Sequence, residues 1–145
     1  RLMVEKIIDL CDEKLGGKTI AVLGLTFKPD TDDMRDAPSL TVVPALVGHG
    51  ADVRVVDPQA FREANEMLPN VTWFDDPYAA VEGAHAVIML TEWNEFRALD
   101  LREMAGRMVA PRMADLRNMY SCDYAIEAGF DAYVCMGRKS QLPLG

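Results

Sequence analysis

Residues 18–58 read KTIAVLGLTFKPDTDDMRDAPSLTVVPALVGHGADVRVVDP, and this stretch decides the fold. Residues 19–25 and 53–56 are short apolar runs rich in β-branched side chains, the pattern of buried strands. Between them, residues 38–47 have the apolar spacing of a helix, and glycines follow where a helix would end. A strand, a helix and a second strand in this order form a βαβ unit, which predicts a parallel sheet.

The rest of the chain continues the alternation of strand and helix patterns. Further strands are predicted at 70–74, 85–90, 109–116 and 131–136, and further helices at 61–68, 76–83, 91–99, 100–106 and 121–128. An amphipathic helix is predicted at residues 2–15. The predicted fold class is therefore α/β, a doubly wound, Rossmann-like and mostly parallel sheet of about six strands with helices on both faces.

Length, composition and charge narrow the class of protein. The chain has 145 residues, of which 50% are hydrophobic, enough for one domain with a sizeable core. A net charge of -8 argues against a nucleic acid or an anionic membrane surface as a partner. No membrane-spanning run or signal peptide is visible, and Cys11, Cys122 and Cys135 follow no CxxC spacing. We therefore expect a cytoplasmic protein with reduced thiols.

The segment after the first predicted strand lacks the dinucleotide-binding fingerprint GxGxxG. Gly24 is present, but no second glycine follows before the helix. Asp57 ends the second predicted strand, yet it lies too far beyond Gly24 for the usual ribose-binding spacing of about twenty residues. A turn role for Asp57 is favoured. NAD binding by this crossover is not expected.

The same loop, residues 26–37, carries two cations among several acids. Lys28 and Arg35 lead into a helix start marked by Pro38 and Ser39, where backbone N–H groups favour a phosphate. The loop also exceeds the usual βα connection of about two to six residues, and long loops are often functional. A diphosphate clamp and an ordinary solvated loop are both open interpretations.

A third candidate cation, Arg117, lies in the sequence DLRN that follows the fifth predicted strand. Since parallel strands end at one edge of a sheet, Arg117 could converge with Lys28 on one anion. The alternative is an ion pair of Arg117 with Asp115 or Asp123.

No catalytic set or metal site can be recognised in the sequence. His49 is expected at a helix end, and His85 opens a strand without a visible partner. Neither has metal-ligand spacing, so no metal is assigned. Trp93 and Phe96 are expected in the core rather than as a base-stacking platform.

Five motifs in order resemble one known family. They are GLTFKPDTDDMRDAPS, a strand ending VDP, VIMLTEWNEF, ADLRN and GFDAYVCMGR. Together they resemble the C-terminal domain of the UDP-glucose/GDP-mannose dehydrogenases, and most closely of the members that oxidise UDP-glucose. On this basis residues 18–138 are predicted to be a UDP-sugar-binding domain. Residues 1–17 are expected to be a helix continuing from a missing upstream region, and residues 139–145 a flexible tail.

The resemblance implies substrate binding rather than oxidation. In that family the sugar 6-hydroxyl is oxidised to a carboxylate in two NAD-dependent steps, and an N-terminal domain binds NAD and carries the catalytic cysteine. Nothing in this chain matches the catalytic segment, so no catalytic residue is assigned and the chain alone is expected to be inactive. The implied partners are a UDP-sugar, the N-terminal NAD-binding domain, and further copies in a homodimer or larger assembly.

The resemblance also implies roles for individual residues. Phe27 and Lys28 match a pair that contacts the nucleotide-sugar, and Arg35 matches an arginine that reaches toward NAD on the other domain. Arg117 matches the arginine of an Asp-Gly-Arg segment near the substrate. Leu116 stands where the family often has glycine, a difference that could alter the backbone beside Arg117.

Alternative functions stay open at this level. The substrate could be another nucleotide sugar, such as a UDP-N-acetyl sugar or GDP-mannose. The domain could instead serve mainly interdomain packing and oligomer assembly. A self-standing oxidoreductase is disfavoured by the missing fingerprint.

Overall fold

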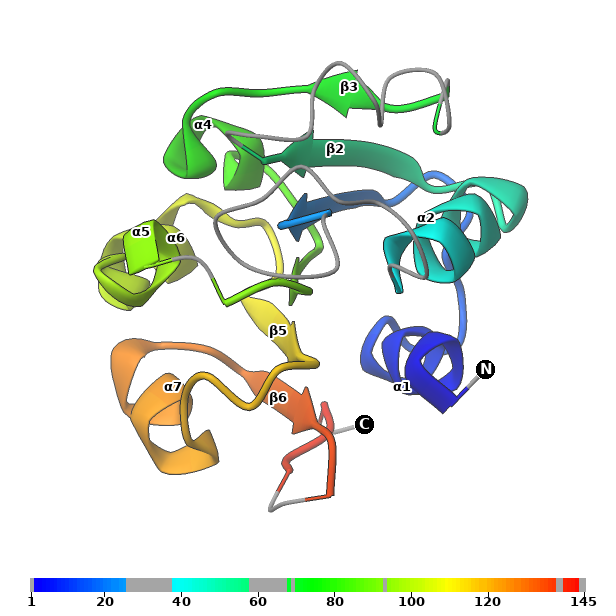
Figure 1. Cartoon of the computed structure of the whole chain (residues 1–145). Helices are drawn as coiled ribbons and strands as arrows, with labels where there is room; N and C mark the ends of the chain where they lie inside the picture. The colour runs from blue at the N-terminus through cyan, green and yellow to red at the C-terminus, as the bar shows by residue number, and fades with distance from the viewer. Residues whose placement is uncertain are drawn as a thin grey trace.

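One six-stranded sheet organises the chain (Figure 1). The computed structural model describes residues 2–25, 38–57, 68, 70–92, 94–137 and 140–143. The strands are β1 (Thr19–Leu23), β2 (Asp52–Val56), β3 (Thr72–Trp73), β4 (Ala86–Met89), β5 (Arg112–Asp115) and β6 (Ala132–Cys135). Their order is β3-β2-β1-β4-β5-β6, and neighbouring strands pair in parallel throughout. This is the doubly wound order, so the predicted fold class is confirmed.

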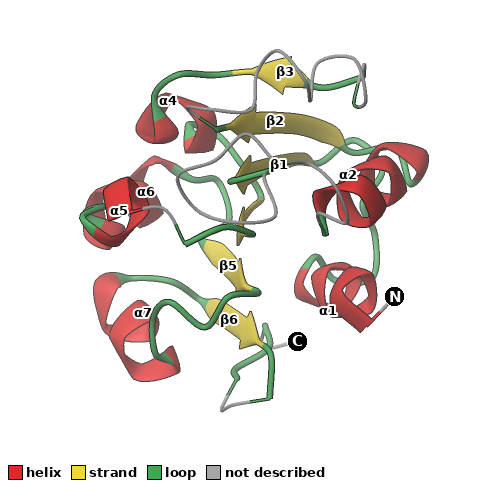
Figure 2. Ribbon diagram, in the orientation of Figure 1, coloured by secondary structure: helices red, strands yellow, loops and turns green. Residues whose placement is uncertain are grey.

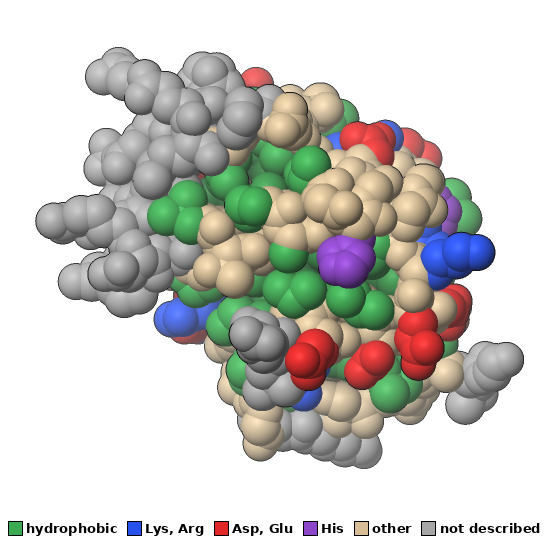
Figure 3. Space-filling model, turned by 90° about the vertical axis from the view of Figure 1, so that its right-hand side faces the viewer, with side chains coloured by type: hydrophobic (Ala, Val, Ile, Leu, Met, Phe, Trp, Pro, Cys, Tyr) green, Lys and Arg blue, Asp and Glu red, His purple; other side chains and the backbone are tan. Residues whose placement is uncertain are grey.

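Helices cover both faces of the sheet (Figure 2). They are α1 (Leu2–Leu10), α2 (Ser39–Gly48), α4 (Pro77–Val81), α5 (Asn94–Arg97), α6 (Leu101–Arg107) and α7 (Cys122–Ala128). Helices α1 and α2 pack on one face, and α4 to α7 pack on the other. On the outside of the α1–α2 face, hydrophobic side chains lie among acidic and other polar ones (Figure 3). Among the described residues no helix is long and apolar enough to cross a membrane.

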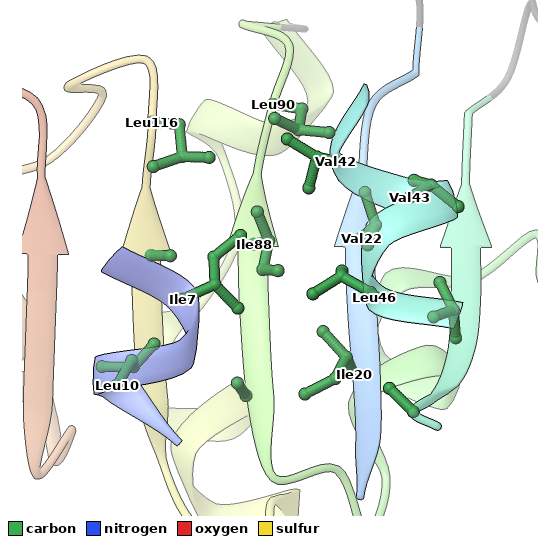
Figure 4. Packing of buried hydrophobic residues seen from close by; sticks show 14 of the residues in the cluster. Ile7, Leu10, Ile20, Val22, Val42, Val43, Leu46, Ile88, Leu90 and Leu116 are labelled. Carbon is green, nitrogen blue, oxygen red and sulfur yellow. The ribbon is translucent and has the colours of Figure 1, made fainter. Parts of the chain in front are cut away.

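The core consists of two layers because side chains alternate along each strand. Ile20 of β1 and Ile88 of β4 are fully buried on the side of α1 and α2, where Ile7 and Leu46 meet them (Figure 4). The residues that follow them, Ala21 and Met89, face the helices on the opposite side and are equally buried. Burial on both faces explains why the strands read as nearly continuous apolar runs.

Several elements are shorter than the sequence pattern predicts, and for α1 and β5 the structure shows the reason. Helix α1 ends at Leu10 because Asp12 and Glu13 have φ of 59° and 63°, which no α-helix can continue. The Lys18 ammonium donates to the Cys11 carbonyl at 2.6 Å and satisfies one group of that helix end. Strand β5 begins only after Pro111, which has no backbone N–H to donate to a neighbouring strand.

Other predicted features are placed by specific contacts. The helix predicted at 61–68 lies outside the described residues except for Leu68, which is buried. His85, for which the sequence shows no partner, has one: its Nδ1 lies 3.1 Å from the Thr19 backbone nitrogen and accepts that N–H. In the predicted tail, Gln141 exchanges two backbone hydrogen bonds of 2.7 Å with Tyr133 at the edge of β6. The first contact joins the start of β4 to the start of β1, and the second pairs the C-terminal segment with β6.

Strand order reverses between β1 and β4, and the chains leaving these two strands meet closely. Gly24 follows β1 with φ of 91°, a conformation that L side chains rarely adopt. A Cβ atom at this position would lie 2.5 Å from the Thr91 Cβ, which follows β4. A glycine is therefore required here both by backbone conformation and by space.

Replacing Gly24 tests this requirement. Gly24→Ala is expected to lower the free energy of unfolding by at least about 2 kcal/mol, since the left-handed backbone and the overlap with Thr91 both add cost. Gly83 is the matched control, because its φ is 72° but a Cβ added there would meet nothing within 4 Å. Gly83→Ala should cost only about 1 kcal/mol. Equal losses for the two variants in urea denaturation would contradict the steric part of this account.

Candidate functional site

Buried polar side chains gather at the carboxyl edge of the sheet. Among the described residues those that are polar and buried are Ser39, Asp57, Thr91 and Asp115. Asp57 follows β2, Thr91 follows β4, Asp115 ends β5, and Ser39 opens the helix that follows β1. Ligands of open α/β sheets bind at this edge, where the strand order reverses. The polar residues therefore mark the candidate site.

Two of them fix the backbone where the chain leaves β1. The Leu25 N–H donates to Asp57 Oδ2 at 2.7 Å, and the Ser39 hydroxyl donates to the Leu25 carbonyl. Both polar groups of Leu25 are thus satisfied by side chains from β2 and α2. Asp57 therefore has a structural role, because its carboxylate accepts a hydrogen bond from the backbone.

Asp115 organises the turn that follows β5. Its carboxylate is fully buried and accepts the backbone N–H groups of Met119 at 2.9 Å and Tyr120 at 2.7 Å. The Tyr133 hydroxyl lies 2.8 Å from Asp115 Oδ2 and 2.8 Å from the Tyr120 carbonyl, so it can donate a hydrogen bond to either acceptor in this turn. A buried carboxylate is stable only when hydrogen-bonded in this manner. Asp115 is therefore committed to holding the backbone.

Leucine is compatible with the backbone at position 116, where the family often has glycine. Leu116 is buried with the α1–α2 layer of the core, and the positive φ of this turn is taken by Asn118 at 56° (Figure 4). The Asn118 amide exchanges hydrogen bonds of 2.9 and 3.0 Å with the backbone of Met136. A glycine is thus not needed at position 116, and Arg117 emerges at the surface from a turn that is fixed on both sides.

Arg117 pairs with an acid that the sequence analysis did not single out. Its guanidinium lies 3.3 Å from Glu92, which follows β4, and its side chain is 39% exposed. The sequence analysis considered an ion pair of Arg117 with Asp115 or Asp123. Arg117 does form an ion pair, but with Glu92, so the predicted partners are wrong. Glu92 and Arg117 each follow a strand, and these strands are neighbours in the sheet, an order that the sequence analysis did not predict.

Other predicted binding residues lie outside the described part of the chain. They are Phe27, Lys28 and Arg35. The structure describes the residues on either side of that segment, Leu25 and Pro38. Convergence of Lys28 with Arg117 on one anion thus stays a prediction.

The histidines and cysteines show no catalytic arrangement among the described residues. His49 caps the end of α2, as predicted, and the three cysteines are buried and form no disulfide with one another. Burial raises the pKa of the Cys11 thiol to about 11, which keeps it protonated and unreactive near neutral pH. Phe96 is buried as predicted, and Trp93 lies outside the described residues. No group of three or more metal-ligating side chains occurs in the described ranges.

Comparison with known proteins agrees with this geometry. Residues 21–122 match the UDP-glucose/GDP-mannose dehydrogenase family, UDP binding domain. The chain belongs to this family. It is 44% identical over 138 residues to a UDP-glucose 6-dehydrogenase of Rhizobium meliloti, and 41% identical over 143 residues to one of Pseudomonas aeruginosa. These alignments include 95% and 94% of the chain but only 31% of each relative.

A solved structure shows the same arrangement of elements. A UDP-glucose dehydrogenase from the hyperthermophilic archaeon Pyrobaculum islandicum superposes with a TM-score of 0.72 at 32% identity. The superposition covers 92% of this chain and 29% of that one. The chain thus spans about a third of its curated relatives, and the family resemblance inferred from the motifs is confirmed.

The turn after β5 is expected to make the stability of the fold decrease at alkaline pH. Burial raises the pKa of the Tyr120 hydroxyl above its ordinary value, and the nearby Asp115 carboxylate adds to the shift. The resulting stability is present below about pH 10, the value in an unfolded chain, and is lost as the pH rises through the folded value. Above about pH 10, unfolding free energies from urea titrations should therefore fall more steeply in the wild type than in Tyr120→Phe. Parallel curves for the two proteins would show that Tyr120 titrates normally.

Proposed function

We propose that this chain is the nucleotide-sugar-binding domain of an NAD-dependent UDP-glucose 6-dehydrogenase, which oxidises UDP-glucose to UDP-glucuronate. The observation that carries the proposal is Arg117, which is exposed at the carboxyl edge of the sheet in a chain that matches a UDP binding domain. The names of the relatives at 44% and 41% identity support the choice of UDP-glucose. In this proposal the catalytic cysteine and the main NAD site would lie in the N-terminal part of the protein, which this chain does not span.

The edge of the sheet has the features that a diphosphate requires. Helix α2 begins there with Pro38 at its N-cap, and no side chain of the described residues caps it. Its first N–H groups and the helix dipole favour an anion. Arg117 adds a guanidinium from the turn after β5, and several N–H donors in a fixed plane suit phosphate oxygens. Since the net charge is -8, such local donors are what can hold a phosphate.

Roles for the remaining residues follow the family pattern. Phe27 and Lys28 would contact the nucleotide-sugar together with Arg117. Arg35 would reach toward NAD on the other domain. The sequence after β1 has no glycine-rich turn of the kind that holds the pyrophosphate of NAD. NAD, which supplies the hydride acceptor, would be held mainly by the N-terminal domain.

The proposal extends to the whole protein. The full-length enzyme would act in the cytoplasm as a homodimer or larger assembly, in the supply of sugar acids for polysaccharide biosynthesis. In that assembly this domain would hold the nucleotide while the N-terminal domain oxidises the sugar. On its own, the chain would bind UDP without turning over substrate.

Calorimetric titration of the 145-residue chain with UDP tests the proposal. We expect UDP to bind, with GDP and NAD binding more weakly. Lys28→Ala and Arg117→Ala should each weaken UDP binding by about 10-fold or more, because charge-assisted hydrogen bonds contribute about 1.5–3 kcal/mol.

One variant serves as a control for the loss of a cation. Lys14 is exposed and precedes β1, at the amino edge of the sheet. Lys14→Ala should leave UDP binding nearly unchanged. Absence of UDP binding at millimolar concentration would contradict the proposed function, whereas preference for GDP would shift it to a GDP-sugar.

A further inference from the structure

Glu92 lies between two arginines at the carboxyl edge. One carboxylate oxygen accepts from Arg117 at 3.3 Å, and the other forms an ion pair with Arg97 at the end of α5. The two guanidinium groups are thus separated by the width of a single carboxylate. They come from different elements, the turn after β5 and a short helix after β4.

The three charged side chains remain open to solvent. The exposed fractions are 52% for Arg97, 39% for Arg117 and 30% for Glu92. One negative charge shared by two positive charges leaves a net positive charge, although the whole chain carries -8. Exposed ion pairs of this kind are weak, so a more highly charged anion can replace the carboxylate.

The position of this cluster links it to the site of strand reversal. Glu92 is the residue after Thr91, whose side chain lies against Gly24 at the end of β1. The Leu90 N–H donates to the Leu23 carbonyl at 2.9 Å and fixes the start of this segment. The carboxylate therefore lies beside the edge where ligands of this fold bind.

We propose that Arg97 and Arg117 form a two-arginine clamp for a diphosphate, which Glu92 fills as an internal anion when no ligand is bound. The clamp rests on the proposed function and deepens it, since it adds Arg97 as a binding residue and Glu92 as a competitor. A tetrahedral phosphoryl group offers three oxygens and more charge than a carboxylate, so both guanidinium groups gain donors and charge by the exchange.

Inorganic pyrophosphate is the probe that tests the clamp directly. Glu92→Gln removes the competing charge and should tighten pyrophosphate binding by about two- to fivefold, the range expected of an exposed charge pair. Arg97→Gln and Arg117→Gln should each weaken it. When both arginines are replaced by glutamine, Glu92→Gln should have little further effect on pyrophosphate binding, because the Glu92 carboxylate then has no guanidinium group to pair with.

A matched control separates the clamp from a general change in charge. Glu103 forms an exposed ion pair with Arg107 at 2.8 Å on α6 and is 44% exposed. Glu103→Gln changes the net charge by the same amount as Glu92→Gln but should leave pyrophosphate binding unchanged. Equal tightening by both variants would mean that net charge alone acts, and would overturn the clamp.

UDP titrations of the same variants distinguish this inference from the proposed function. If UDP binds and Arg117→Gln weakens it, but Arg97→Gln and Glu92→Gln change neither UDP nor pyrophosphate binding, the clamp is wrong and the proposed function stands. Failure of pyrophosphate to bind the wild type at millimolar concentration would also overturn the clamp. Pyrophosphate binding that responds to all three substitutions, without UDP binding, would support the clamp and contradict the UDP-sugar assignment.

Discussion

Helices on both faces of the parallel sheet leave only the strand ends for polar chemistry. Strands β2, β1, β4, β5 and β6 all direct apolar side chains into both layers of the core. A polar side chain within these layers would lose water without regaining hydrogen bonds, at a cost of several kcal/mol on transfer scales. The buried polar residues of the described chain accordingly lie at the carboxyl edge. The same constraint that stabilises the fold places its binding chemistry there.

The acids at this edge are used in two different ways. Asp57 and Asp115 are buried, and both accept backbone N–H groups of the segments that follow β1 and β5. Glu92 is partly exposed and pairs with arginines instead. The buried acids hold the backbone in place, whereas the exposed acid neutralises part of the charge of the two arginines.

Much of this fold could be predicted from residue patterns. The βαβ unit in residues 18–58 led to the correct sheet because buried strands and a glycine-terminated helix follow local rules. The starts of α4 and α7 are equally local, because the side chains of Asp76 and Ser121 each accept a backbone N–H of the following helix. The early end of α1 escaped prediction because Asp12 and Glu13 have positive φ, which their residue types do not require.

The site was less predictable because its contacts join distant segments. The sequence singled out Arg117 but not its partner, since Glu92 is 25 residues away and only strand pairing brings them together. Likewise, the partner of His85 is the backbone of Thr19, 66 residues earlier. The buried network around Asp115 joins β5 to Tyr133 on β6 and has no signature in composition or spacing. Residue types suggested the chemistry, and the topology determined the pairs.

The central claim is that the carboxyl edge of the sheet is a nucleotide-binding half-site. The most direct test is a map of backbone amide NMR shifts of the chain during titration with UDP. Shifts should concentrate at Gly24–Leu25, at Ser39, and at the turns that hold Glu92 and Arg117. Shifts confined to the opposite edge, around His85 and Val109, would contradict the account even if UDP bound tightly.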